Sequence, residues 1–104
     1  MVESEPDFRD WLTTSPEGDE LKSRVRNIVE LLKSNAFLGE QIPRRLWPGT
    51  SPLYRDLNNL YRIRVTDQAR MIYTLIARGD DEMVVRILEF FRTHSEYDKR
   101  FGYG

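Results

Sequence analysis

Residues 59–75 alternate apolar and polar side chains with a period of two, which is typical of strands with one buried face. The odd positions Tyr61, Ile63, Val65, Met71, Tyr73 and Leu75 are apolar, and Arg62, Arg64 and Arg70 occupy even positions. Pairing Val65 with Ala69 across a three-residue loop keeps all six on one face, whereas a two-residue loop would mix arginines into it. The pattern therefore predicts a hairpin of strands 59–66 and 69–77.

A third strand is predicted at 82–91, which is almost continuously apolar. Such a strand is covered on both faces, so we expect it in the interior of the sheet. Residues 78–81 supply the turn before it. The tail from residue 92 is expected to form a last short helix or turn.

Two helical patterns precede the hairpin. Apolar residues 8, 11 and 12 follow Pro6 at i, i+3, i+4 spacing and predict a short helix. A second helix from Glu20 to Ser34, with Asp19 as its N-cap, is predicted by the apolar stripe Leu21, Val25, Ile28, Val29 and Leu32. Residues 1–7 offer no strand, and 39–59, with three prolines, is mostly loop.

The order of these elements predicts an α+β domain, with two N-terminal helices packed on one face of a small antiparallel sheet. The helices then cover the odd positions of the hairpin. The opposite face, which carries Arg62, Arg64 and Arg70, is expected to stay open, with these side chains outside the core.

Length and composition indicate one globular domain over residues 1–104, with 39% hydrophobic residues. The absence of cysteine excludes disulfide and thiolate chemistry and favours a reducing compartment. The acidic N-terminus does not resemble a signal peptide, and no apolar run reaches membrane-spanning length. We therefore expect a cytoplasmic, soluble protein.

The net charge of −1 hides an uneven distribution along the chain. Residues 1–20 hold seven acids against one arginine, whereas residues 41–79 hold seven arginines against two aspartates. A middle rich in arginine favours a surface that binds phosphate or carboxylate groups. Pairing of these arginines with the acids at either end explains the pattern equally well.

Few residues offer catalytic chemistry. With one histidine and no cysteine, we expect no metal site and no cofactor. The remaining candidates are the strand arginines together with Arg92, His94 and Tyr97. Metal-free RNA cleavage needs a base, an acid and cations around the phosphate, and these side chains supply such groups. Capping by His94, packing by Tyr97 and solvation of the arginines are the structural interpretations of the same residues.

Three stretches, "LGEQIPRRLWP", "LNNLYRIRVTDQARMIYTLI" and "VVRILEFFRTHSEYDKRFGY", together resemble the RelE/ParE toxin superfamily, especially its archaeal-type members. The likeness covers about residues 20–103 and lies in the order of the pieces. It implies the toxin of a type II toxin–antitoxin system, with an antitoxin as partner. Many members are endoribonucleases that cut ribosome-bound mRNA, which makes mRNA and the ribosome partners too. ParE-like members inhibit DNA gyrase instead, and a relative that has lost activity is the remaining alternative.

The resemblance also implies roles for individual residues. Arg70 matches the arginine that contacts the scissile phosphate, and Tyr97 resembles the C-terminal catalytic tyrosine. His94 and Arg92 lie where members carry a catalytic histidine or arginine. The RNA-binding candidates are Arg62, Arg64, Arg44 and Arg45.

Overall fold

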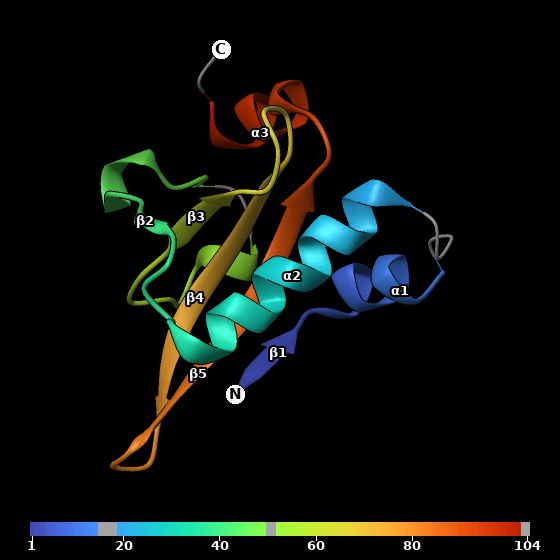
Figure 1. Cartoon of the computed structure of the whole chain (residues 1–104). Helices are drawn as coiled ribbons and strands as arrows, with labels where there is room; N and C mark the ends of the chain where they lie inside the picture. Colours follow the sequence, from blue (N-terminus) through green and yellow to red (C-terminus); the bar gives the residue numbers. More distant parts are fainter. Residues whose placement is uncertain (15–18, 50–51, 103–104) are drawn as a thin grey trace.

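The computed structural model describes residues 1–14, 19–49 and 52–102. These residues form an α+β structure with a five-stranded mixed sheet and three helices (Figure 1). The strands are β1 Val2–Ser4, β2 Glu40–Gln41, β3 Tyr61–Arg64, β4 Arg70–Arg78 and β5 Glu82–Phe91. The helices are α1 Pro6–Thr14, α2 Glu20–Ser34 and α3 His94–Phe101. Between β2 and β3 the chain makes two short 3₁₀ turns, Arg44–Leu46 and Pro52–Tyr54.

The strand order in the sheet is β1-β5-β4-β3-β2, and every pair is antiparallel except β1 with β5. The predicted hairpin register is confirmed, since the Val65 amide donates to the Ala69 carbonyl at 3.0 Å. The interior position predicted for residues 82–91 is confirmed as well, because β5 pairs on both sides. The register followed from side-chain alternation, and the interior position of β5 followed from its nearly continuous apolar run.

The prediction that residues 1–7 hold no strand was wrong. Val2 pairs with Val85 and Ser4 with Ile87, which makes β1 a parallel edge strand. A three-residue strand is too short to show alternation, and its position is set by pairing with the edge of β5. Its Glu3 also bonds Arg86 at 2.9 Å and Arg78 at 3.3 Å, so part of the acidic N-terminus is paired with basic strand residues.

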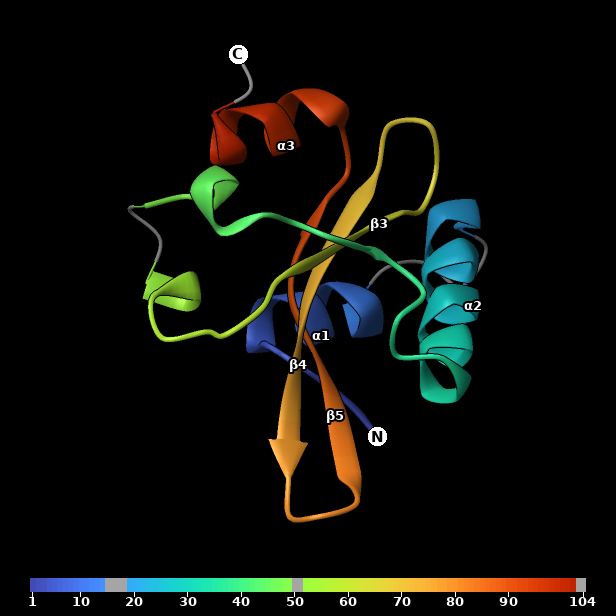
Figure 2. The ribbon, with the colours of Figure 1, turned by 90° about the vertical axis from the view of Figure 1, so that its left-hand side faces the viewer.

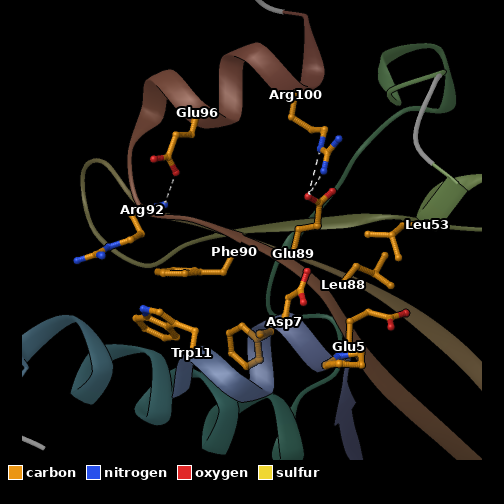
Figure 3. A pocket seen from close by; sticks show the side chains of 12 residues that line it. Glu5, Asp7, Trp11, Leu53, Leu88, Glu89, Phe90, Arg92, Glu96 and Arg100 are labelled. Carbon is orange, nitrogen blue, oxygen red and sulfur yellow. Dashed lines mark hydrogen bonds and ion pairs between the residues drawn. The ribbon is translucent and has the colours of Figure 1, made fainter. Parts of the chain in front are cut away.

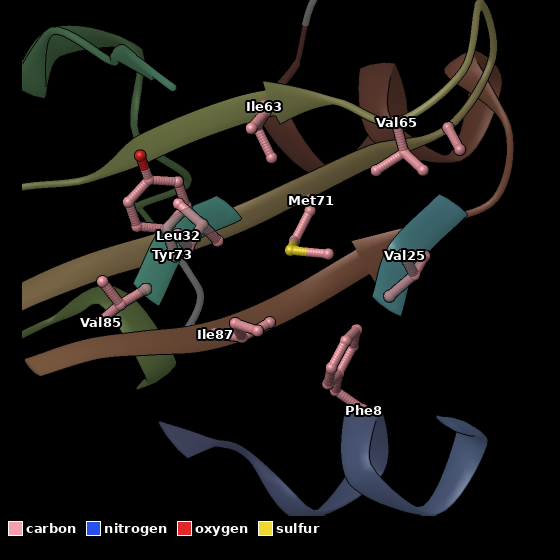
Figure 4. Packing of buried hydrophobic residues seen from close by; sticks show 10 residues of the cluster. Phe8, Val25, Leu32, Ile63, Val65, Met71, Tyr73, Val85 and Ile87 are labelled. Atoms are coloured by element: carbon pink, nitrogen blue, oxygen red, sulfur yellow. The ribbon is translucent and has the colours of Figure 1, made fainter. Parts of the chain in front are cut away.

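One face of the sheet packs against α1 and α2 around the odd positions of the hairpin (Figure 4). Helix α2 has the predicted bounds, and the side chain of its N-cap Asp19 accepts from the Leu21 amide at 2.8 Å. The buried members of this cluster are Phe8, Val25, Leu32, Ile63, Val65, Ala69, Met71, Tyr73, Val85 and Ile87. Tyr61 and Leu75 are partly buried against it, so the six predicted apolar positions share one environment.

The prediction that the opposite face stays open was wrong. A second cluster covers it and consists of Ile42, Tyr54, Leu60, Ile72, Leu88, Phe91, Tyr97 and Phe101. The loop between β2 and β3 and helix α3 fold over this face (Figure 2). The reason is that Ile72, an even position of β4, is apolar, and a register shift at Ile72/Tyr73 adds Leu88 of β5 to the same side. Beside this cluster, β3 carries Arg62, which is half-buried, and Arg64, which is exposed.

Candidate functional site

A hollow of about 320 Å³ lies between the arginine-bearing ends of β3 and β4 and the first turn of α3. The residues that line it are Glu40, Arg62, Arg64, Arg70, His94, Tyr97 and Asp98. Helix α3 is positioned at its start by the N-cap Thr93, whose hydroxyl accepts from the Glu96 amide at 3.2 Å. At its end, Gly102 adopts φ 74°, a left-handed conformation that glycine takes without strain. These two signals set the bounds of α3, and its His94 and Tyr97 line the hollow.

Arg62 connects β3 to helix α3 and to strand β2. Its Nη1 donates to the Tyr97 hydroxyl at 2.8 Å, and its Nη2 bonds Glu40 at 3.0 Å. Burial of the guanidinium disfavours its charge, but the hydrogen bond to Tyr97 and the ion pair with Glu40 outweigh burial and raise the pKa of Arg62. The cation is therefore permanent and fixed in direction.

Arg70 is held by the hairpin loop that it follows. Its Nη1 donates to the carbonyls of Thr66 at 2.9 Å, Asp67 at 3.2 Å and Ala69 at 3.0 Å, and the residue is only 7% exposed. The prediction that its side chain lies outside the core was wrong in this respect. Burial and the neighbouring charges of Arg64 and Arg62 lower the pKa of Arg70, although a guanidinium stays protonated at neutral pH.

Arg64 lies directly across the ladder from Arg70 and is exposed. Within the described residues no carboxylate lies in ion-pair distance of its guanidinium, in contrast to Arg62. Two like charges opposite each other repel in an empty site. The pair is thus favourably placed for an anion that binds both.

The proton-carrying groups come from α3. His94 Nδ1 lies 2.9 Å from Asp98 Oδ2, one helical turn further along, and the ring centroids of His94 and Tyr97 are 6.1 Å apart. Tyr97 is only 2% exposed and packs its ring against Phe91 and Phe101. Only its hydroxyl end takes part in the hollow, through Arg62.

Two residues of the hollow were missed in the sequence analysis. Asp98 had a visible signal, since a carboxylate four residues after a histidine on a helix lies on the same face. Glu40 had none, because it reaches Arg62 through strand pairing across 22 residues. Both are carboxylates, which the charge count of the arginine-rich middle did not include.

Three predicted site residues lie elsewhere. Arg92 lines a different hollow of about 430 Å³, beside Trp11 and Phe90 (Figure 3). Arg44 stacks on Trp47 at 4.6 Å and donates to the Leu57 carbonyl at 3.2 Å, and Arg45 is exposed next to it. A catalytic role for Arg92 beside His94 and Tyr97 therefore has no geometric support. RNA binding by Arg44 and Arg45 stays a prediction.

The arrangement offers anion binding and proton movement. Three guanidinium groups, one phenolic hydroxyl and an imidazole–carboxylate pair line the hollow, and such groups bind anions and move protons. In the part of the chain that the structure describes, no group of three or more His, Cys, Asp or Glu side chains is arranged to hold a metal ion. Nor does any described helix have the length and apolar character needed to cross a membrane.

Comparison with known proteins identifies a likeness in fold. No family model matches the sequence, and no curated protein matches it either. A solved structure, the YoeB/ParE toxin from Agrobacterium tumefaciens, superposes with a TM-score of 0.56 at 12% identity, over 86% of this chain and 93% of the other. The chain therefore has a YoeB/ParE-like toxin fold.

Proposed function

We propose that this protein is the toxin of a type II toxin–antitoxin pair, of the archaeal RelE-like kind, and that it cleaves ribosome-bound mRNA in the cytoplasm without a metal. The observation that carries the proposal is the hollow in which Arg62, Arg64 and Arg70 meet His94 and Tyr97. The fold likeness to a YoeB/ParE toxin supports the toxin class.

The chemistry is an in-line displacement within the RNA. The 2′-oxygen of one nucleotide bonds to the adjacent phosphorus, the bond from phosphorus to the 5′-oxygen breaks, and a 2′,3′-cyclic phosphate and a 5′-hydroxyl result. Nε2 of His94 takes the proton from the 2′-hydroxyl, and the Tyr97 hydroxyl gives one to the leaving 5′-oxygen. Proton transfer from His94 back to the phenolate restores both groups. Because Arg62 donates to the Tyr97 oxygen, it stabilises the charge that develops there.

Arg64 and Arg70 bind the scissile phosphate and stabilise its charge. Negative charge grows on the non-bridging oxygens as the phosphorus becomes five-coordinate, and guanidinium donors fixed nearby stabilise that charge. Arg70 is already positioned by three carbonyl oxygens, so little reorganisation accompanies binding. Arg64, which is exposed and carries no ion pair to a described carboxylate, supplies the accessible cation.

The sharpest test compares Arg64→Ala with Arg55→Ala. Both arginines are exposed and both changes remove one positive charge, but Arg55 lies in the turn after Tyr54, outside the hollow. With ribosomes and a defined mRNA, primer extension should show cleavage by the wild type and by Arg55→Ala at similar rates. Arg64→Ala should be slower by roughly 100-fold or more, as expected for loss of a charge-stabilising donor. Equal rates for both variants would refute the proposed site.

A ParE-like protein that binds gyrase and cleaves nothing is the second candidate. One observation favours it: Arg70 and Tyr97 are 7% and 2% exposed, and both are engaged within the chain. In that case expression should cause DNA damage while mRNA stays intact, and His94→Ala should remain toxic. A relative without activity would leave growth unaffected at comparable expression.

A further inference from the structure

The contact between His94 and Asp98 is not needed to begin α3. Thr93 already caps the helix, and the Tyr97 amide bonds the Thr93 carbonyl at 3.3 Å. An i, i+4 pair of this kind on a helix contributes little to stability. Stabilisation of the helix therefore does little to explain why a carboxylate lies beside His94.

The position of Asp98 is also unfavourable in a way that a fully exposed carboxylate is not. Its Oδ1 is buried without a hydrogen-bond partner among the described residues, while Oδ2 lies 2.9 Å from Nδ1 of His94. A buried oxygen without a partner is unfavourable and rare in native structures. The carboxylate is thus partly buried, and the oxygen that is not orphaned lies against His94.

The contact of His94 Nδ1 with Asp98 Oδ2 at 2.9 Å bears on which nitrogen of His94 carries the proton. A carboxylate accepts but does not donate, so a carboxylate at this distance favours a proton on Nδ1 of neutral His94. Nε2 is then left with a free lone pair. The other polar and charged groups around the hollow are Glu40 from β2, Arg62 and Arg64 from β3, Arg70 from β4 and the Tyr97 hydroxyl from α3. None of the arginines can accept a proton, and Glu40 is bound to Arg62.

We propose that Asp98 is a positioning residue that holds His94 in the Nδ1–H tautomer and orients Nε2 as the base for the 2′-hydroxyl. The inference rests on the proposed nuclease function for its catalytic consequence. When Nε2 takes the proton, the imidazolium that forms lies against the Asp98 carboxylate, which stabilises it. Asp98 itself touches no substrate atom.

The tautomer is directly measurable because His94 is the one histidine in the sequence. Two-bond ¹H–¹⁵N NMR of uniformly labelled protein, at a pH where the ring is neutral, should show a protonated Nδ1 and a bare Nε2 in the wild type. Asp98→Asn keeps the shape of the side chain but can donate from its amide, so the Nδ1–H tautomer should lose its preference. Asp81→Asn, in the exposed turn between β4 and β5, is the matched control and should leave the spectrum unchanged.

Cleavage kinetics then test the role. Asp98→Asn should lower kcat at least about tenfold with little change in KM; the same change in a Ser-His-Asp triad costs roughly 10⁴-fold through the wrong tautomer. In a His94→Ala background the second change should have almost no further effect, because Asp98 acts only through His94. Additive losses, or a wild-type spectrum with the proton on Nε2, would overturn the inference. A wild type that leaves mRNA uncut refutes the nuclease function and the catalytic use of the pair, while the spectrum still decides whether Asp98 sets the tautomer.

Discussion

Three neighbouring arginines of the β3–β4 hairpin differ in what holds them. Arg62 bonds a tyrosine and a glutamate, Arg70 bonds three backbone carbonyls, and Arg64 has no carboxylate partner among the described residues. Sequence alternation correctly predicted that all three leave the odd face. It did not distinguish their roles, because each role depends on atoms of other elements.

Arg70 should therefore contribute to stability as well as to activity. Arg70→Ala removes the donor to the loop carbonyls and is expected to lower the free energy of unfolding by about 1–3 kcal/mol. Arg70→Lys should recover part of that loss, since an ammonium reaches fewer acceptors than a guanidinium. Urea denaturation measures both.

Arg64→Ala is the control, because its exposed side chain should change stability by less than about 0.5 kcal/mol. If Arg70→Ala unfolds at the wild-type midpoint with an unchanged slope, the three carbonyl contacts are not stabilising.

At the scale of elements, two segments that lack a clear pattern complete the sheet and its second core. Strand β1 adds an edge in parallel to β5. The loop after β2 packs Ile42, Tyr54 and Leu60 beneath α3, and the Tyr54 hydroxyl donates to Glu89, which also binds Arg100 at 2.6 Å. These contacts turn a loop that looked structureless into part of the fold.

The attachment of β1 should depend on pH. The hydrogen bond from Arg86, together with the charge of Arg78, lowers the pKa of Glu3 below its ordinary value of 4.5, although desolvation opposes the shift. Folding therefore gains stability from ionised Glu3 above about pH 4.5 and loses it as the pH falls through the lowered pKa. The melting temperature of Glu3→Gln should be lower than that of the wild type at pH 7, and the difference between the two should become smaller in acid.

Glu82→Gln serves as the comparison, because Glu82 is exposed and pairs with Arg78 only through the strand ladder. A gap between Glu3→Gln and the wild type that stays constant from pH 7 to pH 3 would contradict the linkage.

For the whole molecule, the charge asymmetry of the sequence is divided between pairing and exposure. Glu3 and Glu5 of the N-terminus pair with Arg78 and Arg86. The hollow, in contrast, is lined by three arginines and only two carboxylates, Glu40 and Asp98. Pairing with acids thus explains Arg78 of the arginine-rich middle, and anion binding by the arginines of the hollow stays a prediction. The unpaired excess is the feature that an acidic partner segment would recognise.

If an antitoxin with an acidic tail covers this hollow, the complex should weaken as salt is added, because exposed charges are screened. The product of the neighbouring gene is the partner to test. Calorimetric titration at about 50 mM and 500 mM salt should give a clearly larger dissociation constant at the higher concentration. Arg64→Ala should bind more weakly at low salt and show a smaller salt effect, whereas Arg55→Ala should match the wild type. Salt-independent binding would place the partner on another surface.

The sequence by itself determined the elements whose side-chain periods are local. Residues 82–91 form β5 and Glu20–Ser34 forms α2 with the predicted bounds, and the hairpin register followed from six alternating residues. It also brought His94, Tyr97 and the strand arginines together as candidates. Local spacing carries this information because neighbouring residues on one helix or strand share a face whatever the rest of the chain does.

Tertiary structure alone decided the remainder. The pairing of Glu3 with Arg86, of Glu40 with Arg62 and of Arg62 with Tyr97 joins residues 83, 22 and 35 positions apart. The same holds for the second core, for the burial of Arg70 and for the separation of Arg92 from the hollow. Such contacts depend on which segments meet when apolar surface is buried, and no period in the sequence records that choice.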